Sequence, residues 1–328
     1  MLVGQLVLDT VPRRIGDLVP VTGDLPSYAS DEGCDLPKPR LLCFYGLCCF
    51  LSGIWRQALD YDRLSARPPL ISVGVPVMVR ICLSLAGILV LVLAVSAQEK
   101  PKTGFLEKNF KNEDGSSSSY VVFIPKDYDG TKQYPIILFL HGAGETKSTK
   151  KGAKMPVEVG IGPAIKKREN DFPFIVVIPQ AESIQTKVGG RWGADAPDGK
   201  RAIAILDAVM KEYQVDPKRQ YLTGLSMGGF GTWSLAAKYP DRWAAIVPIC
   251  GGGDPQTAEK IKAIPCWCFH GDADTVVPPR FSREMIEALK KAGGTPKYTE
   301  YPKVGHNSWD MAYATDELYK WLLEQRQK

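Results

Sequence analysis

The chain has 328 residues, of which 45% are hydrophobic and 23% are charged, and its formal net charge is +5. This composition is typical of a folded globular protein, and it excludes a wholly disordered chain, a collagen-like fibre and a coiled coil. The basic surplus is too small to indicate nucleic acid as a partner.

An export signal is predicted near the end of the first hundred residues. Residues 78–97 read MVRICLSLAGILVLVLAVSA. Arg80 precedes an apolar run that ends in small residues, which is the layout of a secretory signal peptide. We expect cleavage after Ala97 and a secreted or periplasmic protein. The alternative is an uncleaved anchor that holds the protein at the membrane, although the apolar run falls just short of a comfortable span.

The predicted signal separates an N-terminal segment, residues 1–77, from the mature domain, residues 98–328. Residues 1–77 show no sustained periodicity, and Met78 opens the signal segment. We therefore predict that synthesis starts at Met78 and that residues 1–77 are an upstream over-translation, disordered or absent. Residues 98–328 form the mature domain. Its three cysteines, Cys250, Cys266 and Cys268, lie in apolar segments, so we expect buried free thiols rather than zinc ligands.

Strand and helix patterns alternate along the mature domain. Residues 98–119 are polar and suit a loop or hairpin tip. Continuous apolar runs and helical stripes follow. Strands are predicted at residues 120–124, 135–140, 174–178, 221–222, 244–249, 266–269 and 298–301, and helices at 200–213, 228–239, 282–292 and in the tail to 325. This order predicts an α/β fold with a mostly parallel sheet covered by helices on both faces, whose sites gather at the carboxyl ends of the strands.

A candidate nucleophile lies between a predicted strand and a predicted helix. The segment Gly-Leu-Ser-Met-Gly, residues 224–228, matches the Gly-x-Ser-x-Gly nucleophile elbow. Such a turn lifts the Ser226 hydroxyl above the sheet, and the helix N-terminus favours the negative charge that develops there. A glycine-rich packing turn is the alternative.

A serine hydroxyl needs a general base, and the base needs an acid that orients it. The sequence has three histidines. His306 follows the last predicted strand and is our choice, whereas His141 and His270 each precede a glycine at a strand end and suit structural roles. Asp274 is the predicted acid, Asp272 is its near rival, and Asp254 is a weaker one. A turn-forming role is the alternative for each aspartate.

The loop after residues 135–140 reads His-Gly-Ala-Gly-Glu. Loops in this position supply one backbone N–H of the oxyanion hole, and the residue after the nucleophile supplies the other. We assign these roles to Ala143 and Met227. A phosphate-binding loop is excluded because no Lys-Ser/Thr pair follows the second glycine.

The motifs HGAGE, GLSMGGFGTW, HGDADTVVP and GHNSW, in this order, resemble the α/β-hydrolase superfamily. More closely they resemble secreted carboxylesterases of the phospholipase/carboxylesterase type and plant-biomass esterases such as feruloyl esterases and polyhydroxybutyrate depolymerases. The catalytic domain of the prolyl oligopeptidase family is also similar. The resemblance covers about residues 105–328.

The resemblance implies a serine esterase that cleaves small or polymer-linked carboxylic esters through a triad of Ser226, Asp274 and His306, with no cofactor or metal. Two other functions stay open. A prolyl-oligopeptidase-like peptidase would share all four motifs, although such enzymes usually carry a further N-terminal domain. A non-catalytic binding protein of this fold would usually lack a triad member.

The surroundings of the site are expected to be open. Residues 250–265 are too few to hold the lid domain that is often inserted at this point in the fold. Trp192 and Trp309 are predicted to stack on sugar or phenolic groups of the substrate. Packing in the core or at the rim is the alternative for both indoles.

Overall fold

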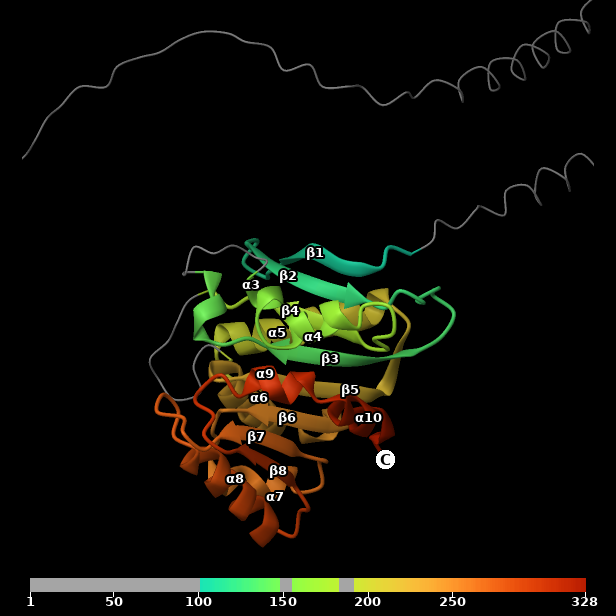
Figure 1. The fold of residues 1–328 in the computed structure, drawn as a ribbon. Coiled ribbons are helices and arrows are strands. Elements are labelled where there is room, and N and C mark those ends of the chain that lie inside the picture. The colour runs from blue at the N-terminus through green and yellow to red at the C-terminus, as the bar shows by residue number, and fades with distance from the viewer. Residues whose placement is uncertain (1–100, 148–154, 183–191) are drawn as a thin grey trace, which may run out of the picture. The chain divides into compact units, whose positions relative to one another are not determined.

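An eight-stranded sheet runs through the computed structural model, which describes residues 101–147, 155–182 and 192–328 (Figure 1). Its strand order is β1-β2-β4-β3-β5-β6-β7-β8. The strands from β3 to β8 are all parallel, and β1 and β2 form an antiparallel edge. The predicted mostly parallel sheet is confirmed. The strands are β1 (Gly104–Lys111), β2 (Ser117–Ile124), β3 (Tyr134–Leu140), β4 (Ile175–Pro179), β5 (Val215–Leu225), β6 (Ala245–Ile249), β7 (Trp267–Gly271) and β8 (Lys297–Tyr301).

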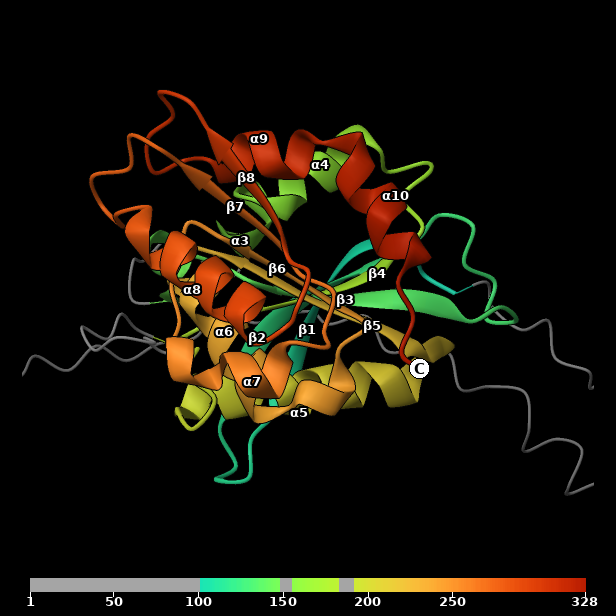
Figure 2. The same ribbon diagram turned by 90° about the horizontal axis from the view of Figure 1, so that it is seen from below.

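Helices cover both faces of the sheet, as predicted (Figure 2). One face packs on α5 (Pro197–Glu212), α6 (Met227–Lys238), α7 (Ala258–Ile261) and α8 (Arg280–Lys291). The other packs on α3 (Met155–Glu158), α4 (Ile161–Lys167), α9 (Trp309–Ala314) and α10 (Asp316–Glu324). Side chains alternate across a strand, so Leu138 of β3 enters the first core and Phe139 enters the second.

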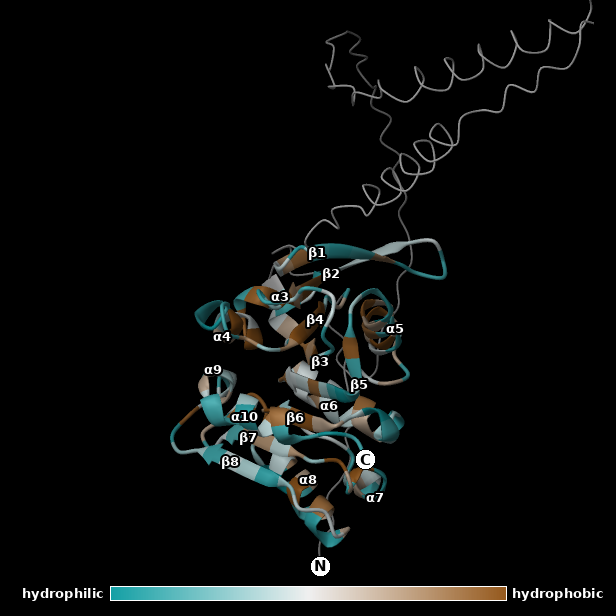
Figure 3. Ribbon diagram, turned by 90° about the vertical axis from the view of Figure 1, so that its right-hand side faces the viewer, coloured by the Kyte–Doolittle hydropathy of each residue, from teal (hydrophilic) through white to brown (hydrophobic). Residues whose placement is uncertain are grey.

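The hydrophobic residues gather in the middle of the sheet. In Figure 3 the central strands are largely brown, whereas teal runs along the edge strands β1 and β8. All seven residues of β3 and all five of β4 are buried. Strands buried on both faces read as continuous apolar runs, which is why the sequence pattern located them closely.

Two predicted elements differ from the structure. Residues 104–111 form strand β1 rather than a loop, and the hairpin tip lies at residues 112–116. Strand β5 begins at Val215, well before the predicted start at residue 221. Pro217 fits inside β5 because the register of β3 and β5 shifts there: Tyr134 pairs with Val215, and Ile136 with Gln220, so the proline N has no ladder hydrogen bond to lose.

Other expectations concern the segments outside and between these strands. Between β6 and β7 the chain forms only the 3₁₀ helix η5 (Pro255–Thr257) and α7, so no lid domain is inserted there, as predicted. Cys250, Cys266 and Cys268 are free and buried, also as predicted. The expected signal segment and residues 1–77 lie outside the described residues. No helix in the described ranges is long and apolar enough to span a bilayer.

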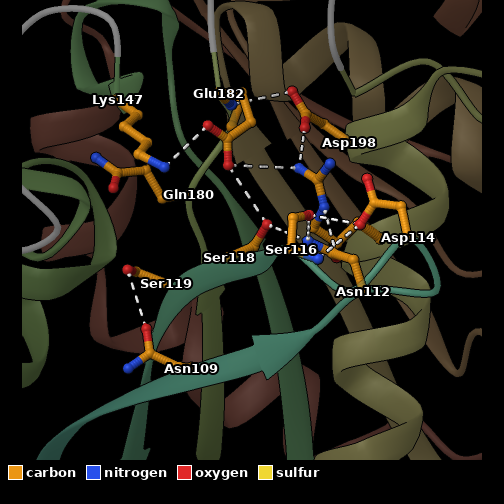
Figure 4. A network of polar contacts seen from close by, with 12 residues as sticks. Asn109, Asn112, Asp114, Ser116, Ser118, Ser119, Lys147, Gln180, Glu182 and Asp198 are labelled. Atoms are coloured by element: carbon orange, nitrogen blue, oxygen red, sulfur yellow. Dashed lines mark hydrogen bonds and ion pairs between the residues drawn. The ribbon is translucent and has the colours of Figure 1, made fainter.

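A polar network fastens the β1–β2 hairpin to the carboxyl edge of the sheet (Figure 4). Glu182, just after β4, lies 3.2 Å from Lys147 Nζ and 3.3 Å from Ser118 Oγ. Arg201 of α5 contacts the buried Asp198 and donates from Nε to Asn112 Oδ1 at 3.1 Å. The network therefore holds the antiparallel edge next to the loops that follow β3 and β4.

Candidate active site

Ser226 occupies a sharp turn between β5 and α6. Its φ is +52°, a strained value for a residue with a side chain, and its backbone N–H donates to Ile249 O at 3.0 Å. The turn is possible because its flanking positions are glycines. A Cβ on Gly224 would lie 2.4 Å from the Gly228 carbonyl oxygen, and one on Gly228 would lie 1.9 Å from the Leu140 carbonyl oxygen. The segment therefore has the geometry of the predicted elbow.

Replacing Gly228 by alanine is expected to destabilise the fold by about 3 kcal/mol or more, because a Cβ there overlaps backbone that cannot move aside. Urea unfolding followed by circular dichroism measures the effect. Gly144→Ala is the matched control: nothing lies within 4 Å of its added Cβ, so its unfolding midpoint should stay near that of the wild type. Equal midpoints for both variants would contradict the close packing of α6 on β3.

The three predicted triad residues meet at the carboxyl edge of the sheet. The Ser226 hydroxyl lies 2.8 Å from His306 Nε2, and His306 Nδ1 lies 2.7 Å from Asp274 Oδ2. Ser226 follows β5, Asp274 follows β7 and His306 follows β8. The elements that carry them are distant in sequence, but their parallel strands end at the same edge. The contacts form one continuous chain from hydroxyl to imidazole to carboxylate.

Asp274 is held as an ion. Burial raises the pKa of its carboxyl group, but hydrogen bonds from His306 and from the backbone N–H groups of Val277 and Val276 outweigh burial and bring the pKa below its usual range. Both backbone groups donate to Oδ1 at 2.9 Å. The carboxylate is thus charged at neutral pH and points its other oxygen at His306.

The two rival aspartates, Asp272 and Asp254, form hydrogen bonds outside the triad. Asp272 is exposed and accepts the backbone N–H of Lys303 at 2.6 Å. Lys303 has a φ of +60°, so Asp272 steadies a strained turn three residues before His306. Asp254 caps η5 by accepting the N–H of Gln256. The sequence did not reveal the part that Asp272 takes in shaping the histidine loop, because that contact joins residues far apart in the chain.

His141 is completely buried and has a structural role, as expected. Its Nδ1–H donates to Gly142 O at 2.6 Å, and its Nε2 accepts the N–H of Ala181 at 3.0 Å. Burial lowers the pKa of this imidazole to about 4, so the ring is neutral at physiological pH. His141 thereby ties the end of β3 to the residues after β4.

The two residues predicted to form the oxyanion hole lie beside the serine. Met227 is the first residue of α6, and Ala143 opens the 3₁₀ helix η2 (Ala143–Glu145). A Cβ added to Gly142 would lie 3.7 Å from Ser226 Cβ, which shows how closely this loop passes the nucleophile. Their role as oxyanion donors stays a prediction.

The two predicted substrate tryptophans differ from each other. Trp192 is only 1% exposed, because its indole N–H donates to His141 O at 2.9 Å and its ring meets the His141 ring edge-on. It has no free face for a substrate, so this prediction is wrong and the packing alternative holds. Trp309 is partly exposed and meets the His306 ring edge-on, with ring centroids 5.3 Å apart. Its contact with substrate stays a prediction.

One group in the described ranges could offer metal ligands: Cys250, Asp274 and His306, whose ligand atoms lie within 4.8 Å of one another. Burial raises the pKa of the Cys250 thiol, so the thiolate that zinc prefers is disfavoured. His306 and Asp274 already bond to each other. The arrangement fits the hydrogen-bonded chain better than a metal centre.

Comparisons with known proteins point to esterases. A family model described as "Putative esterase" matches residues 115–267. A solved thermostable esterase is 34% identical, with a TM-score of 0.58 over 68% of this chain and 63% of its own. The bifunctional acetylxylan esterase/xylanase XynS20E of Neocallimastix patriciarum is 25% identical over 52% of this chain. Poly(3-hydroxyalkanoate) depolymerase C of Paucimonas lemoignei is 32% identical over 36% of this chain.

The curated relatives are longer than the matched region. The match spans 23% of the acetylxylan esterase/xylanase and 28% of the depolymerase. The matched region of the present chain therefore corresponds to one part of each of these proteins.

Proposed function

We propose that this chain, which has the α/β-hydrolase fold, is a serine esterase that hydrolyses carboxylic esters through an acyl-enzyme. Ser226 is the nucleophile, His306 the general base and Asp274 the residue that orients the base. The observation that carries this proposal is the hydrogen-bonded chain from Ser226 Oγ through His306 to an ionised Asp274. The esterase family model and the similar thermostable esterase support it.

The reaction has two halves that use the same groups. Ser226 Oγ attacks the ester carbonyl carbon while His306 Nε2 takes the hydroxyl proton. Backbone N–H groups of Met227 and Ala143 stabilise the oxyanion. His306 then gives the proton to the leaving alcohol, and the acyl group stays on Ser226. Water attacks the acyl-enzyme with His306 as base, and the acid leaves as the proton returns to Ser226.

The substrates we propose are esters carried by carbohydrate or another polymer. The chain has no lid insertion between β6 and β7, which suits a bulky substrate. Two relatives are named for polymer esters, an acetylxylan esterase and a polyhydroxyalkanoate depolymerase. Export through residues 78–97 would bring the enzyme to such polymers.

A substrate panel tests this proposal. We expect hydrolysis of p-nitrophenyl acetate, methyl ferulate and acetylated xylan, but no cleavage of the amide Gly-Pro-p-nitroanilide. Faster cleavage of the amide than of every ester would favour the peptidase alternative. No turnover together with no labelling by a fluorophosphonate would favour a binding protein. Release of acetate from xylan, compared with p-nitrophenyl acetate at equal enzyme concentration, tests the preference for polymers.

A further inference from the structure

A second, fully buried histidine lies behind the proposed triad. His270 belongs to β7, and its Nε2 lies 3.2 Å from Asp274 Oδ2 and 2.8 Å from the carbonyl oxygen of Val277. Its Nδ1 lies 2.7 Å from Ser282 Oγ of α8. The proposed mechanism uses none of these contacts, yet they join the catalytic carboxylate to the core beneath α8.

The partners of His270 fix the position of its proton. Both groups that face Nε2, a carbonyl oxygen and an ionised carboxylate oxygen, can only accept, so Nε2 must carry a hydrogen. Burial lowers the pKa of this imidazole, so the ring holds one proton. Nδ1 then carries a lone pair. Ser282 Oγ lies 2.7 Å from this nitrogen and 3.0 Å from the Gly251 carbonyl oxygen, and its one hydrogen is assigned to the nearer acceptor, His270 Nδ1.

The contact of Ser282 with Cys268 agrees with this assignment. Cys268 Sγ lies 3.3 Å from Ser282 Oγ. Burial raises the pKa of the Cys268 thiol to about 12, so the thiol keeps its proton and donates it to the hydroxyl oxygen. Hydrogen bonds therefore run in one direction, from Cys268 through Ser282 and His270 to the carboxylate.

His270 also completes the set of donors around Asp274. Oδ1 accepts the backbone N–H groups of Val276 and Val277, and Oδ2 faces His306 and His270. Val277 takes part twice, because its N–H donates to Oδ1 and its carbonyl oxygen faces His270 Nε2. The His270 imidazole therefore contacts both the Asp274 carboxylate and the turn at Val277 that binds this carboxylate.

We propose that His270 is a positioning residue for the proposed triad: its Nε2–H holds Asp274 Oδ2 and the Val277 carbonyl, and so aims the carboxylate at His306 Nδ1. The inference rests on the proposed function for its catalytic consequence. The arrangement of the proton and of its acceptors is a property of the folded chain and is testable without turnover.

Two substitutions of His270 distinguish the contribution of Nε2 from that of Nδ1. Glutamine can place its amide N–H₂ near the position of Nε2, whereas asparagine reaches only the position of Nδ1. We expect His270→Asn to lower kcat about 10- to 100-fold, as the loss of an orienting partner does at other sites, with little change in KM. His270→Gln should restore most of that loss.

The pH profile distinguishes positioning from simple destabilisation. Without a donor from residue 270, Asp274 Oδ2 becomes a stronger acceptor and favours the protonated form of His306. The acid limb of kcat/KM should therefore move to higher pH in His270→Asn and stay in place in His270→Gln. A merely structural role would lower the melting temperature of both variants and leave both profiles where they are in the wild type.

The other titratable groups around this cluster do not interfere. The ligand atoms of Cys250, Asp274 and His306 lie within 4.8 Å of one another, and Cys268 Sγ contacts Ser282 Oγ. Burial raises the pKa of both thiols, which stay neutral. Glu300 lies near His270, and its hydrogen bond from Arg283 lowers the pKa of this carboxyl, which stays charged.

Nitrogen-15 NMR of the full chain with labelled histidine tests the inference independently of activity, since the sequence has only three histidines. His270→Gln and His141→Gln assign the signals. We expect His270 to be neutral, to carry its proton on Nε2 and to take up a second proton only at a lower pH than an ordinary imidazole. An Nδ1–H tautomer, or titration like a free imidazole, would overturn the inference whatever the enzyme assays give. An esterase-inactive wild type with the expected spectrum would instead overturn the proposed function alone.

Discussion

Replacing Ser226 by alanine is expected to lower kcat for ester hydrolysis by about 10⁶-fold, the loss that removal of the nucleophile causes in another serine hydrolase. The substitution removes the only atom that can form the acyl-enzyme in the proposed mechanism. The neighbouring contacts stay, because the backbone N–H of residue 226 can still donate to Ile249 O. Alanine at a φ of +52° is strained to the same extent as serine, so the melting temperature should change little.

Two measurements separate loss of chemistry from loss of fold. Initial rates with p-nitrophenyl acetate and labelling by a fluorophosphonate should both disappear in Ser226→Ala, while circular dichroism stays as in the wild type. Ser117→Ala, at the exposed start of β2, is the matched control and should keep full activity and full labelling. Undiminished turnover by Ser226→Ala would falsify the assignment of the nucleophile.

The elements that the sequence predicts best are those in which both faces of a strand are buried. Residues of β3 and β4 form unbroken apolar runs, and their observed bounds differ from the predicted ones by a single residue. Strand β1 was missed because it is an edge strand whose residues alternate between partly buried and exposed, and its polar composition resembles that of a loop. The start of β5 was missed because a proline is rarely found inside a central strand, so Pro217 argued against extending the predicted strand before residue 221.

The same difference separates the site residues that local sequence motifs predict from the contacts that depend on distant segments of the chain. Ser226, His306 and Asp274 stand in short motifs at strand ends, so the motifs together with the order of the elements predicted that they lie close together. The contacts of Asp272 with Lys303 and of His270 with Ser282 depend on how separate loops and helices pack, which no local pattern encodes. Trp192 was misjudged for the same reason: nothing in its neighbourhood in the sequence indicates that it packs on His141.

Replacing Asp274 by asparagine is expected to lower kcat by about 10⁴-fold, through a change of tautomer rather than a loss of shape. The N–H groups of Val276 and Val277 both donate to Oδ1, so the amide oxygen of asparagine must occupy that place. The amide N–H₂ then takes the place of Oδ2 and faces His306 Nδ1 as a donor. Nδ1 can accept only if its own proton moves to Nε2.

That shift removes the base from the reaction. A hydrogen on His306 Nε2 faces the Ser226 hydroxyl, and the nitrogen can no longer take the hydroxyl proton. The same amide also meets the proposed Nε2–H of His270, a contact between two donors that should loosen the turn at Val277. The large loss in kcat should therefore be accompanied by a modest fall in melting temperature.

Asp272→Asn is the matched control for this variant. Asp272 uses one oxygen to accept the backbone N–H of Lys303, and an asparagine oxygen can accept the same bond. We expect its kcat to stay within about threefold of the wild type, since an exposed neutral acceptor replaces a charged one at the cost of a small weakening. Parallel assays of both variants decide between the two aspartates. If Asp272→Asn suffers the larger loss, the carboxylate that orients His306 in solution is Asp272, and the arrangement of the β7 loop described here is not the catalytic one.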